Sequence, residues 1–358
     1  MSVDARERVL TRMRGEETDR PPVAIFSQSA TAGMMAAYGA SWPSAHNDPV
    51  QMAVLGAAQA DMFGFEAVRA PFGITGEAER LGCGVLPGGR SKRPVVTDYA
   101  YKLDPLMSQF DDPSSLMSPE LFVSGGSPAV AQEAVSILKK FYGEDYPVVA
   151  GNAGTLTLTG MLVNPENLVF AIVMAPEEVQ RWLKTVAPLV AAYTSALFEA
   201  GADVVQCSEP ISSGDWMTKD IFEDTCGRYV FVTHCPDHSR DRFTELHVCG
   251  NSLPIVDALF GTGVSGVSIG DVVQPSSVAD LAKGREVVIG NIGISQPLLN
   301  GNPEQVEATV EDCMNEGFDI ISSGCGLHPE TPDDNLRAMV KKVTGQDHEP
   351  VASRITVQ

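Results

Sequence analysis

The sequence predicts an α/β protein whose parallel strands close into a (β/α)8 barrel. From residue 203 onward, short continuous apolar segments alternate with segments of helical periodicity, a pattern typical of a parallel sheet covered by helices on both faces. With the earlier apolar segments they make about eight expected strands, the number of a closed barrel. The 358 residues suffice for one such barrel or for two ordinary domains. A doubly wound open sheet is the rival architecture, but it would not bring the ends of the fifth and last strands together as readily.

The N-terminal part is expected to supply a helical extension, residues 1–20, and the first two strands. Apolar runs bounded by turn-forming residues predict strands at 22–26 and 66–72. Helical patterns predict helices at residues 2–15, 31–38 and 48–62, the last with Asp48 as N-cap ahead of Pro49. Residues 73–125 are rich in Gly, Pro and charge and lack a clean period. We interpret them as loops and hairpin-like segments inserted into a single domain, 1–358.

The rest of the chain alternates strands and helices. Strands are predicted at residues 147–152, 203–210, 243–249, 266–271, 286–291 and 319–323. Helices are predicted at residues 127–141, 176–200, 218–231, 251–260, 276–283, 302–316 and 332–343. Because chemistry in such barrels sits at the C-terminal ends of the strands, residues at those ends are the candidates for function.

The most specific chemical signal lies in residues 243–251, where His247 and Cys249 are two positions apart at the end of an apolar run. In a strand such side chains share one face, about 6.6 Å apart along the chain. Zinc binds sulfur at about 2.3 Å and imidazole nitrogen at about 2.0–2.1 Å, so both could bind one ion with a third ligand. Cys325, flanked by glycines at the end of the last expected strand, is the candidate. Three such ligands leave one tetrahedral position open. The alternative is a core strand with a buried thiol and a histidine bonded within the protein.

Other polar residues are expected at the same mouth. Glu209 lies at the end of the strand that precedes the His-x-Cys strand. It could be a fourth, exchangeable zinc ligand or a general base, and the alternative is an ordinary loop carboxylate. We expect contacts to cofactor or substrate from three residues at other strand ends, Asn152, Asp271 and Asn291. His328, three residues after Cys325, is a further candidate, with a surface histidine as the alternative.

A second group of potential metal ligands, Thr233-His-Cys-Pro-Asp-His-Ser239, falls between a helix and a strand on the opposite face. Pro236 favours a turn there, so we interpret this segment as a solvated connection. Structural roles are expected for Cys83, Cys207, Cys226 and Cys313. The chain has no Walker-type motif, no strand-linked Gly-x-Gly-x-x-Gly and no Gly-x-Ser-x-Gly.

Composition excludes some partners. Lys and Arg total 25 against 46 Asp and Glu, a net charge of −21, which repels phosphate backbones and anionic membranes. Nucleic acid is therefore not an expected partner. No apolar run approaches the ~18 residues of a membrane span, and the first residues are charged and helical, unlike a signal peptide. With seven Cys in no dense framework, we expect reduced thiols and a cytoplasmic protein. The sequence does not indicate an oligomeric state.

Two motifs follow one another as in a known family: His247-Val-Cys-Gly250 ahead of a helix, then Ser323-Gly-Cys-Gly326 ahead of Pro329-Glu-Thr-Pro332. Further matching segments are Glu7-Arg-Val-Leu10, Asp19-Arg-Pro-Pro22, Glu199-Ala-Gly-Ala-Asp203 and Ile289-Gly-Asn-Ile292. Over nearly its whole length the chain thus resembles the zinc-dependent corrinoid:coenzyme M methyltransferases of the uroporphyrinogen decarboxylase superfamily.

The resemblance implies that His247, Cys249 and Cys325 bind zinc and that Glu209 holds the fourth position until a thiol displaces it. It implies methyl transfer from a methylated corrinoid (methylcobamide) to a small thiol such as coenzyme M. Zinc suits this reaction because coordination deprotonates a thiol whose pKa is otherwise near 8.5. The chain lacks an Asp-x-His-x-x-Gly cobalamin pattern, so a separate corrinoid protein is the expected partner. The sequence points to no donor cluster for the sulfonate of coenzyme M.

Three other functions stay open at this stage. The chain could demethylate a methoxy, methylamine-like or halogenated compound onto the corrinoid, with zinc as a Lewis acid. It could be a metal-free decarboxylase of a porphyrinogen, although the Arg-Gln-Ala-Gly-Arg motif of that branch is absent and Phe26-Ser-Gln-Ser29 stands near its place. A zinc-stabilised scaffold without activity would need a closed fourth position.

Overall fold

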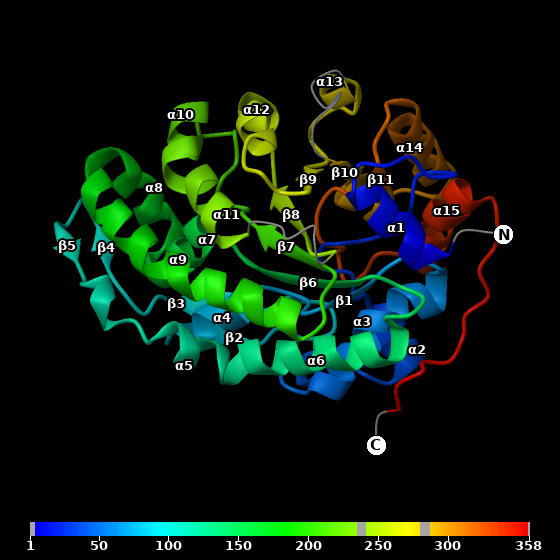
Figure 1. Cartoon of the computed structure of the whole chain (residues 1–358), viewed down its shortest axis with the longest axis horizontal. Helices are drawn as coiled ribbons and strands as arrows, with labels where there is room; N and C mark the ends of the chain where they lie inside the picture. Colours follow the sequence, from blue (N-terminus) through cyan, green and yellow to red (C-terminus); the bar gives the residue numbers. More distant parts are fainter. Residues whose placement is uncertain (1–3, 235–240, 280–286, 357–358) are drawn as a thin grey trace.

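The computed structural model of the chain describes residues 4–234, 241–279 and 287–356. Its main sheet has seven parallel strands in the order β1-β6-β7-β8-β9-β10-β11 (Figure 1). These are β1 (Val68–Ala70), β6 (Val148–Ala153), β7 (Val204–Ser208), β8 (Phe243–Val248), β9 (Gly266–Ile269), β10 (Val287–Ile292) and β11 (Ile320–Ser323). All seven were predicted within a few residues.

Residues 22–26 complete the barrel. Val23 forms an isolated parallel bridge with Ile321 of β11, and the Ala24 amide donates to the Ile321 carbonyl at 3.0 Å. On the other side, the Glu66 amide just before β1 donates to the Val23 carbonyl at 2.8 Å. This segment therefore links the last strand of the sheet to the first, and the predicted (β/α)8 architecture is confirmed.

Helices cover the outside of the sheet (Figure 1). They are α1 (Ala5–Met13), α2 (Ala32–Tyr38), α3 (Pro49–Phe63), α6 (Gly126–Tyr142), α7 (Thr155–Val163), α8 (Pro165–Met174), α9 (Pro176–Glu199), α10 (Lys219–Phe222), α11 (Arg228–Thr233), α12 (Val256–Phe260), α13 (Ser276–Ala279), α14 (Pro303–Asn315) and α15 (Asp333–Thr344). Asp48 caps α3 as expected, accepting the Val50 and Gln51 amides. The helix predicted at 218–231 is instead α10 and α11 joined by a π-helical turn, Glu223–Gly227.

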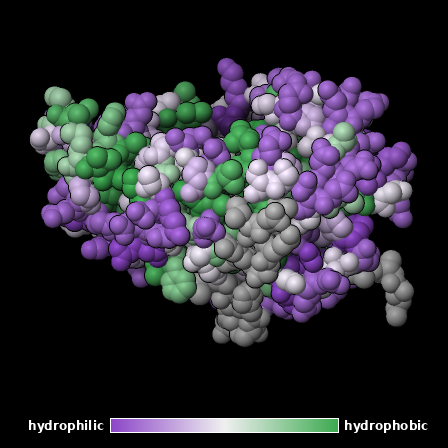
Figure 2. All heavy atoms as spheres, turned by 90° about the horizontal axis from the view of Figure 1, so that it is seen from above, coloured by the Kyte–Doolittle hydropathy of each residue, from purple (hydrophilic) through white to green (hydrophobic). Residues whose placement is uncertain are grey.

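The insertion at residues 73–125 contains more regular structure than expected. It comprises α4 (Thr75–Arg80), the hairpin β2 (Gly84–Leu86) and β3 (Val95–Asp98), the hairpin β4 (Leu103–Asp104) and β5 (Gln109–Phe110), and α5 (Pro119–Val123). Figure 2 shows hydrophobic residues gathered at the end of the molecule where Figure 1 places α8 and the β4–β5 hairpin. We retain 73–125 as a proposed insertion into one barrel domain.

One end of the barrel is closed by hydrophobic packing. Val9, Leu10 and Met13 of α1 form a buried cluster with side chains of the strands, among them Phe243 of β8. Since side chains alternate along a strand, Glu245 and His247 follow Phe243 on the same face. Along this face of β8, Phe243 therefore lies in the apolar floor, Glu245 in the buried middle of the barrel and His247 at the opposite mouth.

Among the described residues, no single helix is long and apolar enough to cross a membrane. The helices α7 and α8 reach that length and apolar composition only when they are taken together, and the chain bends by 109° between them.

The expectation of a solvated connection is wrong for Thr233 and His234. Both are buried, and the His234 ring is bonded on both nitrogens: Nε2 to Asn152 Oδ1 at 2.9 Å and Thr194 Oγ1 at 3.2 Å, Nδ1 to Thr233 Oγ1 at 2.8 Å. The physical reason is that α11 packs against α9 and α7, which carries the ring between those helices and β6. Residues 235–239 of this segment lie outside the described residues.

Burial lowers the pKa of His234 to about 3, so the ring is neutral in the folded chain and charged in the unfolded chain below pH 6.5. The unfolded state then binds more protons at this residue, and the contribution of His234 to stability falls as pH drops from 6.5 towards 3, by about 2 kcal/mol at pH 5. We predict from urea unfolding at pH 7 and pH 5 that the pH dependence of the unfolding free energy differs between the wild type and His234→Gln by about this amount, with the wild type less stable at pH 5 relative to the variant. Parallel pH dependences in the two proteins would contradict the assignment.

Candidate metal centre

The ends of β8 and β11 bring His247, Cys249 and Cys325 into one cluster. Their ligand atoms all lie within 4.8 Å of one another. His247 Nε2 is 3.2 Å from Cys249 Sγ, which is 3.3 Å from Cys325 Sγ. Tetrahedral zinc with ordinary bond lengths separates such atoms by about 3.5–3.8 Å, so a small outward movement would admit the ion. Two sulfurs and one imidazole nitrogen are a donor set that zinc accepts, and the residues present therefore fit it.

Glycines allow the two cysteine turns. Gly250, directly after Cys249, has φ +73°, and a Cβ there would lie 2.5 Å from Asp215 Oδ2. A Cβ on Gly324, directly before Cys325, would lie 2.7 Å from the Asp271 backbone nitrogen. The glycines that flank the cysteines thus let the loop after β11 pass close to the loop after β9, which places Cys325 beside Cys249.

The other nitrogen of the His247 ring has a fixed partner. Nδ1 is hydrogen-bonded to Ser268 Oγ of β9 at 2.9 Å, which leaves Nε2 facing the cysteines. Partners of this kind orient metal-binding histidines and fix their tautomer. Hydrogen bonds with Cys249 and His247 lower the pKa of the Cys325 thiol, whereas the pKa of Cys249 is raised by its hydrogen bond to Cys325 and by burial.

A buried polar layer lies between the cluster and the apolar floor. Arg69 donates from Nε and Nη1 to the carbonyls of Phe26 and Pro71, and from Nη2 to Gln206 Oε1 at 2.9 Å. Burial lowers its pKa to about 10, and burial raises the pKa of the nearby Glu245 carboxyl. The sequence-based reasoning missed Glu245, Gln206 and Ser268, although the i, i+2 spacing of Glu245 from His247 was a signal that could have found the first.

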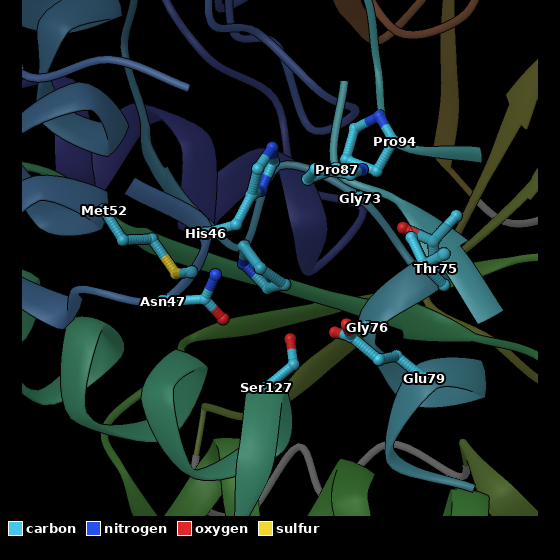
Figure 3. A pocket seen from close by; sticks show the side chains of 12 residues that line it. His46, Asn47, Met52, Gly73, Thr75, Gly76, Glu79, Pro87, Pro94 and Ser127 are labelled. Atoms are coloured by element: carbon cyan, nitrogen blue, oxygen red, sulfur yellow. The ribbon is translucent and has the colours of Figure 1, made fainter. Parts of the chain in front are cut away.

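The cluster opens into a cavity of about 240 Å³. Its lining includes the three cluster residues, Arg69, Arg93 and Trp42, and contains no Asp or Glu among the described residues. A smaller cavity of about 50 Å³ adjoins it, sharing Gly73, Thr75 and Pro94. Figure 3 shows the side chains of His46, Asn47, Glu79 and Ser127 around this second cavity.

Glu209 does not join the cluster. It is completely buried and accepts hydrogen bonds from the Leu156 amide, the Thr157 amide and Thr157 Oγ1 at 3.0, 2.9 and 2.7 Å. Burial raises its pKa to about 7. These donors belong to the first turn of α7, so the carboxylate caps that helix instead of facing the cysteines. The expectation of a fourth zinc ligand is not supported by this position.

The four expected contacts to cofactor or substrate lie outside the cavity lining. Asn152 is bonded to Thr194 and His234, and Asn291 donates to the Gly270 and Val273 carbonyls. Asp271 accepts the Ile294 amide at 2.9 Å, and His328 Nδ1 accepts the Glu330 amide at 3.1 Å. In this arrangement Asn291, Asp271 and His328 stabilise loops at the mouth, whereas Asn152 joins β6 to α9 and to His234. A direct contact of any of the four to a ligand stays a prediction.

The model of the family described as uroporphyrinogen decarboxylase (URO-D) matches residues 4–346. The chain belongs to this family. Its relatives include the methylcobamide:CoM methyltransferase MtbA of Methanosarcina acetivorans, 31% identical over 94% of this chain and 96% of the relative. The methylcobamide:CoM methyltransferase MtaA of Methanosarcina barkeri is 29% identical over 93% of this chain and 95% of the relative. The solved structure of a methyltransferase from Methanosarcina mazei has a TM-score of 0.88 at 28% identity, covering 96% of this chain and 99% of that one.

Ser268 should matter for metal affinity without touching the metal. We predict that Ser268→Ala weakens zinc binding by about 10–100-fold, because His247 loses the partner that orients its ring. Competition with a chromogenic chelator measures this. Ser252→Ala is the matched control, since the Ser252 hydroxyl is buried without a hydrogen-bond partner among the described residues. Equal zinc affinity in both variants and the wild type would refute the role of Ser268.

Glu209→Gln separates capping from metal binding. If Glu209 caps α7, this variant keeps the zinc content of the wild type and loses about 1–3 kcal/mol of unfolding free energy, because an NH2 group faces donors. Metal analysis and urea unfolding test both halves. A Glu209→Gln protein that has normal stability and binds zinc poorly would contradict the capping role and indicate that the carboxylate is a zinc ligand.

Proposed function

We propose that the chain is a zinc-dependent methyltransferase that moves a methyl group from a methylated corrinoid, carried by a partner protein, to a small thiol such as coenzyme M. The observation that carries this proposal is the cluster of His247, Cys249 and Cys325 at the bottom of an open cavity. Its curated relatives named above are methylcobamide:CoM methyltransferases, which supports the same reaction here.

His247, Cys249 and Cys325 would hold the zinc, which when bound would favour the thiolate form of a coordinated thiol at neutral pH. Ser268 keeps the His247 ring oriented, and the glycines around the cysteines keep both sulfurs at the mouth. In the transfer, the thiolate sulfur forms a bond to the methyl carbon while the cobalt–carbon bond breaks and leaves its electron pair on cobalt. The thiol proton passes to solvent. The protein's part is therefore positioning.

The barrel mouth suits a corrinoid brought from outside. The cluster lies in a cavity and not in a closed site, and both cysteines are partly exposed. No corrinoid-binding pattern occurs in the sequence. We therefore include a corrinoid protein as the partner in the proposal. A cytoplasmic location, expected from the sequence, stays a prediction.

The decarboxylase alternative is disfavoured by the cavity. A porphyrinogen carries many carboxylates and needs several cationic partners. The described lining offers two arginines, and the donors of Arg69 are directed to Phe26, Pro71 and Gln206. This charge inventory does not match such a substrate.

The test combines metal analysis with transfer from free methylcobalamin to coenzyme M. We predict about one zinc per chain in the wild type, and loss of zinc together with at least about 100-fold lower transfer in His247→Ala, Cys249→Ser and Cys325→Ser. Cys83→Ser is the control, because Cys83 is a buried thiol of the insertion outside the cluster. Zinc-free wild-type protein with full transfer activity would contradict the proposal.

A further inference from the structure

Arg93 connects the insertion to the metal cluster. It lies in the connection between β2 and β3, and its Nη2 donates to the carbonyls of Gly326 and Leu327, each at 2.6 Å. A Cβ on Gly326 would lie 3.5 Å from Arg93 Nη1, so the guanidinium group lies directly beside the residue that follows Cys325. Arg93 also lines the same cavity as the cluster.

The cavity presents positive charge inside a strongly acidic protein. The chain has a net charge of −21, yet no carboxylate lines the described cavity and two arginines do. The donors of Arg69 are directed to protein acceptors. For Arg93, among the described residues, only Nη2 has hydrogen-bond partners, so Nε and Nη1 remain for a ligand. Arginine presents several N–H donors in a planar fork that matches oxyanions.

Trp42 adds a second donor. Its side chain is 2% exposed and lines the cavity, and its Nε1 has no hydrogen-bond partner among the described residues. An indole N–H can only donate, so a buried one without a partner favours a ligand that brings an acceptor. Apolar side chains of Phe72, Ile74 and Pro94 complete this part of the wall and suit a short hydrocarbon chain.

We propose that Arg93, with the Trp42 indole N–H, binds the anionic tail of the thiol substrate and thereby selects short thiols that carry a sulfonate or carboxylate and no ammonium group. This inference rests on the proposed function, since the thiol end must reach the metal cluster. An amino-thiol is disfavoured because its ammonium group meets arginines and finds no carboxylate in the described lining. Arg93 Nη2 then holds the turn at Cys325, while Nε and Nη1 of the same guanidinium group bind the anionic tail of the substrate.

The test measures thiol binding to the zinc-loaded full chain by calorimetry, in the wild type and in Arg93→Gln. The probes are 2-mercaptoethanesulfonate, 3-mercaptopropionate, 2-mercaptoethanol and 2-aminoethanethiol. Because each thiol is compared with itself in two proteins, differences in thiol acidity cancel. We expect Arg93→Gln to weaken both anionic thiols by about 10–100-fold, the usual value of a charged hydrogen-bonded contact. Binding of 2-mercaptoethanol should stay within about twofold.

Lys92→Gln is the matched control, since it removes the same charge from an exposed neighbour and should leave all four affinities unchanged. If Arg93→Gln loses zinc, the variant Arg93→Lys is used in its place. It should weaken the binding of the anionic thiols alone, because a single ammonium group replaces the planar set of guanidinium donors. Equal weakening of neutral and anionic thiols would overturn the proposal and assign Arg93 to the cluster itself. If no thiol binds the wild type, the proposed function fails as well, whereas binding without dependence on tail charge overturns this inference alone.

Discussion

The site depends on the curvature of the sheet. His247 and Cys249 belong to the end of β8 and Cys325 to the end of β11, with β9 and β10 between them. In a flat sheet, neighbouring strands about 4.8 Å apart would separate these ends well beyond the reach of one ion. The hydrogen bonds of residues 22–26 to Ile321 and Glu66 close the sheet into a barrel, and this closure brings three positions distant in sequence close enough to be candidate ligands of a single metal ion.

Within the closed barrel, the interior changes from apolar to polar to reactive along the strand direction. Phe243, Glu245 and His247 follow one another on one face of β8, with α1 packed under the first. The buried Arg69 is held by three acceptors of the interior, the carbonyls of Phe26 and Pro71 and Gln206 Oε1, which limits the cost of placing its charge there. The cluster therefore stands on a rigid support, as a site that must hold two thiolates and a histidine in fixed geometry requires.

Much of this was predictable because it is local. Strand and helix periodicity predicted the order of the elements, and the His-x-Cys spacing with a glycine-flanked cysteine predicted which three residues would meet. What the sequence did not reveal are contacts between residues distant in sequence. The sequence indicated that Glu209 ends a strand, but it did not indicate that three donors of α7 form hydrogen bonds to its carboxylate. Arg93 lies in an insertion without periodicity, and it donates hydrogen bonds to Gly326 and Leu327, more than 230 positions later in the sequence. His234 is buried by the packing of helices, which the sequence of its own segment does not reveal.

In the proposed function, the cluster activates a thiol at an open metal position. Zinc K-edge X-ray absorption of the purified zinc-loaded chain, recorded before and after addition of coenzyme M, tests it most directly. We expect two sulfur neighbours of the zinc, from Cys249 and Cys325, before the addition and three after it. A zinc environment that already holds four protein ligands, or one that does not change when the thiol is added, would contradict it.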